Sequence, residues 1–434
     1  MSDKIAVIGG GVAGLSAAYA LRDAGEVTIF DADNRLGGHA NTIEVFEGDR
    51  LIGLDTAFII FNEPSYPNFS KFLTELGVES IAHNGGFNLY DLDAGTQFGT
   101  AEFDLDEEQV RASYPERFVA MWREAKRFHT EAPRDFFRKK ADQPLGEYLR
   151  DRGYSEDFLH GYVVQLSTAV WSIPPERIFE MPASTLIAFF MAHDAEGLGG
   201  RSVSWKTVAG GSISYVRKAI ELAQPTIRLN QPVIEIRDEP DGVTVVTAEG
   251  PTHFDYAVLA THADDALALL ANPTPAQAAI ECISYNSTTA VLHTDTSVLP
   301  ADRTRWKSWN FGQIEVDGVV HSWPVYNLNG IQGLSTEKDY LVTLECPLPI
   351  DPASIIQEIP YRHPVLTLAV RKLQATIYQA HRDTRVFLAG SYLHSKSLGP
   401  DQMGSHEAGF SSGLEAAKAL RNAQATRLTS GTTG

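Results

Sequence analysis

The stretch that decides the fold opens the chain: Lys4-Ile-Ala-Val-Ile8, then Gly9-Gly-Gly-Val-Ala-Gly14, an apolar helical pattern from Leu15 to Leu21, and Glu26-Val-Thr-Ile-Phe-Asp31. The first and last of these segments are short, apolar and β-rich, as buried parallel strands are. The order is therefore strand, glycine turn, helix, strand and acid. This order predicts the beginning of a doubly wound α/β domain.

The glycines of this turn have the spacing G-x-G-x-x-G, and each has a physical role. Gly9 permits a tight turn, Gly11 lets backbone N–H groups approach a pyrophosphate, and Gly14 lets helix and strand pack closely. The helix N-terminus adds partial positive charge for the phosphates. Asp31 ends the second strand, where a carboxylate can accept hydrogen bonds from ribose hydroxyls. We predict a dinucleotide site here; a purely structural glycine turn is the alternative.

A second glycine pair follows in Arg35-Leu-Gly37-Gly38-His39. Acid-x-x-x-Arg-x-Gly-Gly resembles the signature of the flavin amine oxidase superfamily, which includes monoamine and polyamine oxidases, protoporphyrinogen oxidase and carotenoid desaturases. The resemblance implies FAD as the cofactor, with Arg35 and the glycine pair at its diphosphate. The chain departs from the pattern at Asp31, where Glu is more common, and at His39, which replaces a common Arg.

The resemblance recurs in later segments of the chain. The segment from Arg228 to Val246 is similar to the hairpin that covers the adenine, with Val233 as the backbone contact. The segment from Phe254 to Thr261 is similar to the strand that returns to the nucleotide domain. Arg385 to Ser391 and Gly404 to Ala417 resemble the last strand and the closing helix, although Ser391 stands where an acid is usual. The cofactor-binding residues so implied are Gly9, Gly11, Val12, Ala13, Gly14, Asp31, Ala32, Arg35, Gly37, Gly38, His39, Thr56, Val233, Ala260, Thr261, Gly390, Ser391, Glu407 and Ala408.

The predicted fold class is α/β: a doubly wound, Rossmann-like FAD-binding domain with an interwoven α+β substrate domain. At 434 residues the chain is too long for one simple core. We expect the FAD-binding domain to be discontinuous and the substrate domain to fill the gaps, with a polar, unstructured tail. The segments are 1–64, 203–267 and 381–421 for the first domain, 65–202 and 268–380 for the second, and 422–434 for the tail.

Composition narrows the class of protein further. Apolar residues make up 43% and charged residues 21%, as in globular proteins, and no apolar run approaches the roughly 18 residues of a membrane span. A strand at residue 4 leaves no room for a signal peptide, so a cytoplasmic location is expected. The net charge of −19 disfavours nucleic acid. Neither Cys282 nor Cys346 lies in the C-terminal glycine-rich region, so FAD is expected to be bound without a covalent link, and no histidine spacing predicts a metal.

Two further patterns have structural interpretations. An apolar stripe recurs at helical spacing and predicts a core-facing helix, whose basic opposite face is solvated or, alternatively, touches a membrane surface. Gly409-Phe-Ser-Ser-Gly413 spells the nucleophile elbow of hydrolases, but no strand precedes it. We therefore read it as part of the closing helix. The stripe consists of Phe118, Met121, Trp122, Ala125, Phe128, Ala132 and Phe136.

The chemistry of such a site belongs mainly to the flavin, so the candidate catalytic residues are those that the resemblance brings near its ring. An imidazole can move a proton while the flavin takes a hydride, and a carboxylate can hold its tautomer. The alternative is that His406 and Glu407 only cap the closing helix. The aromatic segment Trp306, Trp309, Phe311, Trp323 and Tyr326 is expected to line an apolar slot. The catalytic candidates are His39, Tyr392, His394, His406 and Glu407.

These observations predict an FAD-dependent oxidoreductase that abstracts hydride from a C–N or C–C bond of a mostly apolar small molecule. No second nucleotide motif is present, so electrons should pass to oxygen or another acceptor. Arg35 to Thr42, Phe61 to Asn68 and Thr207 to Ser212 resemble most closely a poorly characterised bacterial branch of FAD-binding proteins, associated with fatty-acid-modifying enzymes. Lipid metabolism is therefore a hypothesis beside amine oxidation. A redox-neutral FAD-dependent isomerase and a non-catalytic FAD-binding protein stay open.

Overall fold

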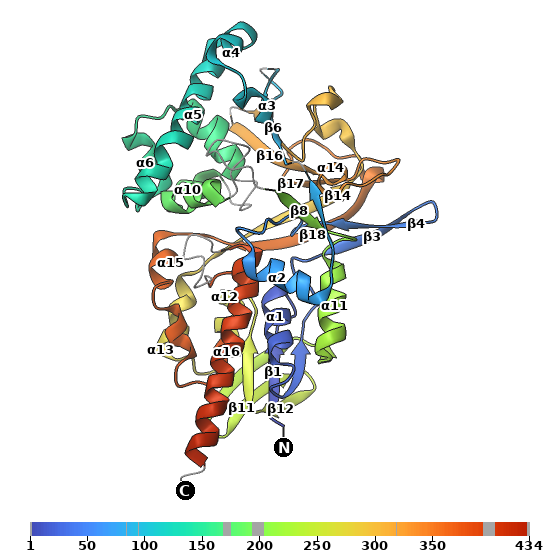
Figure 1. The fold of residues 1–434 in the computed structure, drawn as a ribbon, viewed down its shortest axis with the longest axis vertical. Helices are drawn as coiled ribbons and strands as arrows, with labels where there is room; N and C mark the ends of the chain where they lie inside the picture. Colours follow the sequence, from blue (N-terminus) through green and yellow to red (C-terminus); the bar gives the residue numbers. More distant parts are fainter. Residues whose placement is uncertain are drawn as a thin grey trace.

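The computed structural model describes residues 2–83, 85–93, 95–167, 175–192, 204–317, 319–393 and 404–431 (Figure 1). In Figure 1 a parallel sheet flanked by helices forms one end of the molecule, and a cluster of helices forms the other end. The larger antiparallel sheet lies between these two ends. Both chain termini lie at the end that carries the parallel sheet.

The parallel sheet has the strand order β19-β13-β1-β2-β9, and all its neighbours are parallel. Alternate residues of its central strand are buried on opposite faces: Ile5 and Val7 pack with the helices, Ala6 and Ile8 with the small sheet β10-β11-β12. A strand covered on both faces must be apolar throughout, as the opening sequence is. The strands are β1 (Lys4–Ile8), β2 (Glu26–Phe30), β9 (Thr226–Arg228), β13 (Tyr256–Leu259), β19 (Val386–Leu388), β10 (Val233–Glu239), β11 (Gly242–Thr247) and β12 (Gly250–Phe254).

Helices α1 (Val12–Leu21), α11 (Ile213–Ala223) and α16 (His406–Gly431) cover one face of this sheet, and α2 (Pro67–Leu76) packs against α11 and α16. The pair α1 and α16 packs closely because α16 presents Gly413 to α1. A Cβ at Gly413 would lie 2.1 Å from the Ala13 carbonyl oxygen. The segment Gly409–Gly413 lies inside α16, so the hydrolase reading of that motif is excluded.

The second sheet has seven strands in the order β18-β14-β17-β16-β15-β6-β7. Only the pair β15 and β6 is parallel. Two short pairs, β3-β4 and β5-β8, join it to the rest. The strands are β6 (Phe87–Asp91), β7 (Thr96–Gly99), β14 (Tyr285–His293), β15 (Trp309–Val316), β16 (Val319–Asn327), β17 (Leu341–Leu344), β18 (Ile355–Pro364), β3 (Thr42–Glu47), β4 (Arg50–Asp55), β5 (Ser80–His83) and β8 (Trp205–Val208).

A helical layer completes this half of the molecule. The predicted apolar stripe lies on α5 (Glu116–Phe137), where Phe118, Trp122 and Phe128 are buried, so its assignment to the core is confirmed. No helix in the described residues is long and apolar enough to cross a membrane. The other helices are α3 (Thr100–Phe103), α4 (Glu107–Ser113), α6 (Leu145–Asp151), α7 (Glu156–Phe158), a π-helical turn (Leu159–Val164), α9 (Pro175–Ile178), α10 (Ala183–Ala192), α12 (Ala263–Leu269), α13 (Pro275–Ala278), α14 (Leu328–Gln332) and α15 (Leu368–Leu373), with short 3₁₀ turns at 279–282, 296–298, 303–305, 352–354 and 377–381.

The prediction of an unstructured tail from residue 422 is wrong, because α16 continues to Gly431. Polar residues of the segment find partners at the N-terminal end of the sheet. Arg427 pairs with Asp3 and, at 3.1 Å, with Asp255, and the Gln424 amide donates to the Ala24 carbonyl. The polar residues of this C-terminal segment therefore attach a helix to the rest of the protein. The exact domain boundaries stay a prediction.

Candidate active site

One cavity of about 580 Å³ lies between the two sheets, at the carboxyl ends of β1, β2, β13 and β19. Ligands of doubly wound folds bind at this edge of the sheet. Its lining includes fourteen of the predicted cofactor-binding and catalytic residues, contributed by six separate segments. They are Gly9, Gly11, Val12, Ala13, Asp31, Gly37, Gly38, His39, Ala260, Thr261, Gly390, Ser391, Tyr392 and His406.

We call the main-chain-rich part of this lining the glycine half: Gly9, Gly11, Val12, Ala13, Gly37, Gly38, Gly390 and Ser391. Gly11 precedes α1 with an extended backbone (φ −69°) that any residue can adopt. A Cβ there would meet only the Gly38 Cα, at 4.0 Å, so a larger side chain would extend into the cavity. The first N–H groups of α1 have no side-chain cap. A diphosphate fits here, because the cavity wall is backbone without bulky side chains and the uncapped N–H groups of α1 can donate hydrogen bonds to its oxygens.

Supporting residues hold the glycine half in shape. Asp31 accepts hydrogen bonds from the Gly10 and Asp33 amides, at 2.7 and 2.9 Å, and burial raises the pKa of its carboxyl. Arg35 donates to the Gly38 carbonyl at 2.9 Å, so its side chain secures the turn and does not line the cavity. A Cβ at Gly14 would lie 1.9 Å from the Gly9 carbonyl oxygen, which makes this position a packing contact.

Four further predicted cofactor residues lie outside the cavity lining. Thr56 donates to the Asn41 carbonyl and bonds the Tyr361 hydroxyl at 2.7 Å. Val233 begins β10 and packs beside the core, and Ala408 is buried in α16. Ala32 follows β2 and is exposed. None of these four is among the described residues that line the cavity.

His39 is half-buried in the cavity wall, within a group of aromatic and imidazole rings. Its ring centroid lies 4.9 Å from that of Tyr361, 5.1 Å from that of His363 and 6.1 Å from that of His262. Burial and these neighbouring histidines hold its pKa well below the usual value, so the ring is neutral. It hydrogen-bonds the backbone of Arg362, whereas Nε2 has no partner among the described residues. Nε2 is thus an unused acceptor at the cavity.

Tyr392 provides a second unpaired polar atom. Its side chain is buried and lines the cavity, and its hydroxyl has no hydrogen-bond partner among the described residues. Burial raises its pKa well above the usual value, so the phenol stays protonated. Buried polar groups are rarely left unpaired in native proteins. The Tyr392 hydroxyl and His39 Nε2 are therefore suited to polar atoms of a bound group.

His406 lies at the start of α16 and also lines the cavity. Its ring stacks on Phe58 with a centroid separation of 3.5 Å, and its Nε2 lies 3.2 Å from the Tyr215 hydroxyl. Burial lowers its pKa to about 3, so this ring is also neutral. His394 lies outside the described residues, and its prediction is untested.

Glu407 has a different place from the one predicted for a catalytic acid. The side chain is fully buried and does not line the cavity. Its carboxylate accepts hydrogen bonds from the Asn68 and Phe69 amides, at 3.1 and 3.0 Å, and from the Ser411 hydroxyl. These amides belong to the first turn of α2, whose N-cap residue, Tyr66, offers no side-chain cap. Glu407 therefore caps α2, a role that its sequence position beside His406 did not reveal.

The other part of the lining is the aromatic half: Phe87, Leu166, Phe189, Phe190, Trp205, Trp309, Phe311 and Tyr326. Trp309, Phe311 and Tyr326 were expected, but Trp306 and Trp323 do not line the cavity. Trp323 is buried against Tyr90, and the Trp306 indole donates to the Pro300 carbonyl. β15 and β16 pair antiparallel, so their side chains alternate between the two faces of the sheet. The other members come from β6, β8, α10 and Leu166, and no local motif marked them.

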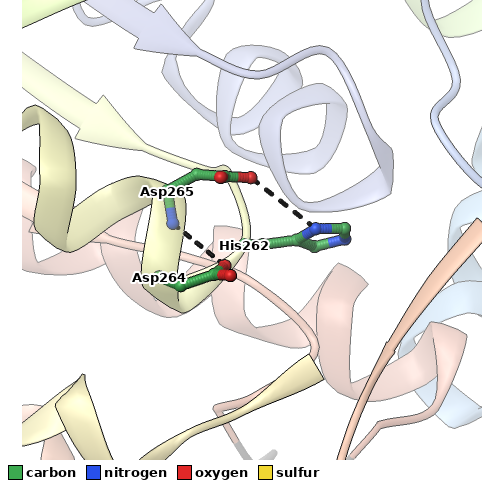
Figure 2. Close-up of side chains that lie close together, drawn as sticks. All are labelled: His262, Asp264 and Asp265. Atoms are coloured by element: carbon green, nitrogen blue, oxygen red, sulfur yellow. Dashed lines mark hydrogen bonds and ion pairs between the residues drawn. The ribbon is translucent and has the colours of Figure 1, made fainter. Parts of the chain in front are cut away.

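Sequence reasoning also missed a charged group at the cavity edge. Figure 2 shows the Asp265 carboxylate turned toward the His262 ring, with 3.7 Å between carboxylate oxygen and Nδ1. These two residues and Asp264 place possible ligand atoms within 4.8 Å of one another. However, the Arg362 guanidinium pairs with both aspartates. The cationic position is therefore already taken by a side chain, and the cluster gives no support to a metal site.

The model of the family described as "Flavin containing amine oxidoreductase" matches residues 12–336. The chain belongs to this family. The predicted recognition is thereby confirmed, and so is FAD as the cofactor, for which non-covalent binding is typical of the family. Neither Cys282 nor Cys346 lines the cavity, which agrees with that mode of binding.

Individual similarities are more distant. An L-amino-acid oxidase from Siganus canaliculatus is 25% identical over 317 residues, which cover 68% of this chain and 57% of that protein. The chain spans about half the length of the curated relatives that it matches. The structure of a double mutant of putrescine oxidase superposes with a TM-score of 0.68 at 14% identity, and the match covers 97% of this chain and 99% of that chain. The structure of a CLA-producing fatty acid isomerase from P. acnes superposes with a TM-score of 0.64 at 15% identity, and the match covers 96% of this chain and 98% of that chain. The structures confirm the predicted fold class.

Proposed function

We propose that this protein is an FAD-dependent oxidoreductase that removes hydride from a C–N or C–C bond of a mostly apolar small molecule and passes the electrons to oxygen or another acceptor. The observation that carries the proposal is the continuity of one cavity from the glycine half to the aromatic half. A cofactor bound by its diphosphate in the first can present its ring to a substrate in the second. Bound FAD would supply the hydride acceptor.

The lining supports an apolar substrate. The described lining residues from β6, β8, β15, β16, α10 and Leu166 include no Asp, Glu, Lys or Arg. An alkyl or aryl group would replace water there at a gain of about 25 cal/mol per Å² of buried apolar surface. The names of the relatives, L-amino-acid oxidase and putrescine oxidase, support an amine, whose nitrogen must enter as the neutral base or be held by aromatic faces.

His39 is the residue to which we assign proton transfer. When a substrate loses hydride it must also lose a proton to become an imine or an alkene. His39 Nε2 is an acceptor at the cavity with no other described partner. The Tyr392 hydroxyl can orient a polar atom of the substrate or cofactor. The surrounding rings exclude water and keep both groups neutral until they act.

A redox-neutral isomerase acting on an unsaturated lipid is the second candidate. It is favoured by the same uncharged aromatic half and by the overall likeness to a CLA-producing fatty acid isomerase. A non-catalytic FAD-binding protein is the third, and it predicts no response of the flavin to any ligand.

Anaerobic mixing of the purified yellow protein with amines, an L-amino acid and unsaturated fatty acids separates these candidates. We expect lasting loss of the flavin absorbance with one class, and oxygen uptake when air is admitted. Product without lasting bleaching or oxygen uptake identifies the isomerase. His39→Asn should slow the bleaching at least about a hundredfold, the usual range for a lost general base, with FAD still bound. An unchanged rate would remove His39 from the reaction.

A further inference from the structure

The Tyr215–His406 pair joins a buried tyrosine to a half-buried histidine of the cavity lining, and its protons can be assigned. Tyr215 lies on α11, is fully buried, and contacts the Phe69 ring at 5.2 Å. Its hydroxyl makes one hydrogen bond among the described residues, to His406 Nε2 at 3.2 Å. Since leaving a buried phenol proton without an acceptor is costly, we infer that the hydroxyl donates to Nε2.

The tautomer of His406 follows from this assignment. The ring is neutral, because burial lowers its pKa to about 3, so only one of its nitrogens carries a proton. Nε2 accepts from Tyr215, and the proton therefore lies on Nδ1. The ring cannot turn freely, because it is stacked on Phe58 and lies edge-on to Phe69. Since His406 lines the cavity at the N-terminus of α16, a fixed N–H donor is added to a helix end that already favours negative charge.

We propose that Tyr215 is a positioning residue: it holds His406 in the tautomer protonated on Nδ1, and His406 thereby donates a hydrogen bond to an acceptor atom of the bound flavin. The donor stabilises the electron-rich, two-electron-reduced ring more than the oxidised ring. The inference rests on the proposed function only through bound FAD, and it concerns the redox equilibrium of the cofactor, whatever the substrate.

A second buried pair provides a matched control. The Tyr162 hydroxyl lies 2.6 Å from His129 Nε2, Tyr162 is buried and His129 is half-buried, and desolvation lowers the pKa of His129 to about 3. His129 and Tyr162 do not line the cavity. Tyr162→Phe therefore removes a similar hydroxyl from a similar histidine at a distance from the flavin.

The test compares the two-electron midpoint potential of the bound flavin in the wild-type holoprotein, three single variants and one double variant. Tyr215→Phe keeps the ring packing and should lower the preference for the reduced flavin about tenfold, which for a two-electron couple is about 30 mV. Tyr162→Phe should leave the potential unchanged. His406→Phe should lower it by at least as much, and Tyr215→Phe should have no further effect in that background, because Tyr215 acts only through His406.

Two results would overturn the proposal: an unchanged potential in Tyr215→Phe, or an equal shift with and without His406. If Tyr215→Phe fails to retain FAD, the ¹⁵N chemical shifts of the histidines in the wild-type holoprotein report the tautomer of His406 directly. The His406 signals are assigned as those that are missing from the spectrum of His406→Phe. We expect Nδ1 to carry the proton, and a proton on Nε2 refutes the inference. These readouts need no turnover, so a protein that oxidises no substrate but shows the expected shift would contradict only the proposed function.

Discussion

The two halves of the cavity are built by different means. The glycine half consists mainly of backbone, and three of its residues, Gly11, Val12 and Ala13, are consecutive in the chain. The aromatic half consists of side chains that strands and helices bring together from positions between 87 and 326. The shape of the glycine half depends on the absence of Cβ atoms at its glycines. The shape of the aromatic half depends on the volume of its rings. One added side chain should therefore abolish binding in the glycine half, whereas the aromatic half should change gradually.

The largest effect is expected for Gly11→Val. The backbone of Gly11 is extended and a Cβ meets no protein atom closer than 4.0 Å, so the apoprotein should fold with nearly unchanged thermal stability. The added branches would occupy the place of the diphosphate, and FAD should be lost. Flavin absorbance of the purified protein and titration with FAD measure this. Gly330→Ala, in α14 outside the cavity, is the control and should stay yellow; a yellow Gly11→Val protein would refute the diphosphate assignment.

An intermediate effect is expected for Trp309→Leu in the aromatic half. Trp309 faces Trp205 with a ring separation of 5.9 Å, and truncation enlarges the substrate region without touching the glycine half. FAD should remain bound, while affinity for an apolar ligand should fall about tenfold, or ~1.4 kcal/mol. Trp306→Leu removes an indole that lies outside the cavity and serves as the control. Equal losses in both variants would show that the effect is general and does not come from the cavity.

The smallest effect on either half is expected for Asp55→Asn. The Asp55 carboxylate is buried outside the cavity lining. It accepts hydrogen bonds from the Thr42 hydroxyl at 2.6 Å and the Ser212 amide at 2.9 Å, and burial raises its pKa to about 7. A folded pKa above the unfolded value means that the protonated form favours folding. The contribution of Asp55 to the free energy of unfolding is fully present below about pH 4. Between about pH 4 and 7 this contribution falls by about 1.4 kcal/mol per pH unit, and it is lost above about pH 7.

Unfolding by urea between pH 4 and 8 should therefore show a decline in stability that is weaker in Asp55→Asn. FAD affinity should hardly change. Asp241→Asn, an exposed aspartate in the turn between β10 and β11, is the control and should follow the wild type. Parallel curves for Asp55→Asn and the wild type would mean that Asp55 is ionised at neutral pH in the folded protein.

The difference between the halves also explains what the sequence could predict. The first strand, helix and second strand were expected at Lys4–Ile8, Leu15–Leu21 and Glu26–Asp31, and β1, α1 and β2 lie there. Local periodicity and glycine spacing define such elements, because each residue's role depends on near neighbours. The hairpin from Arg228 to Val246 was predicted from the family resemblance, and β10 and β11 lie there, although the third strand of that sheet, β12, was not predicted.

Residues whose role depends on distant partners could not be predicted in this way. Glu407 bonds amides 338 and 339 positions earlier in the chain. His363 reaches His39 only because β18 lies at the edge of the seven-stranded sheet. The C-terminal helix was cut short at residue 421 because the partner of Arg427, Asp3, lies at the opposite end of the sequence. Spacing in the sequence carries no record of such pairings.

The contact between α1 and α16 has a consequence for the order in which the protein matures. The Ser16 hydroxyl donates to the Phe410 carbonyl at 2.8 Å, and the Ser412 hydroxyl accepts from the Gly390 amide. The fingerprint in the first residues is thus completed by α16, which begins only at His406. Translation runs at about 5–20 residues per second, so the nascent glycine turn waits tens of seconds for its partner. We therefore expect FAD capture only after synthesis has reached α16.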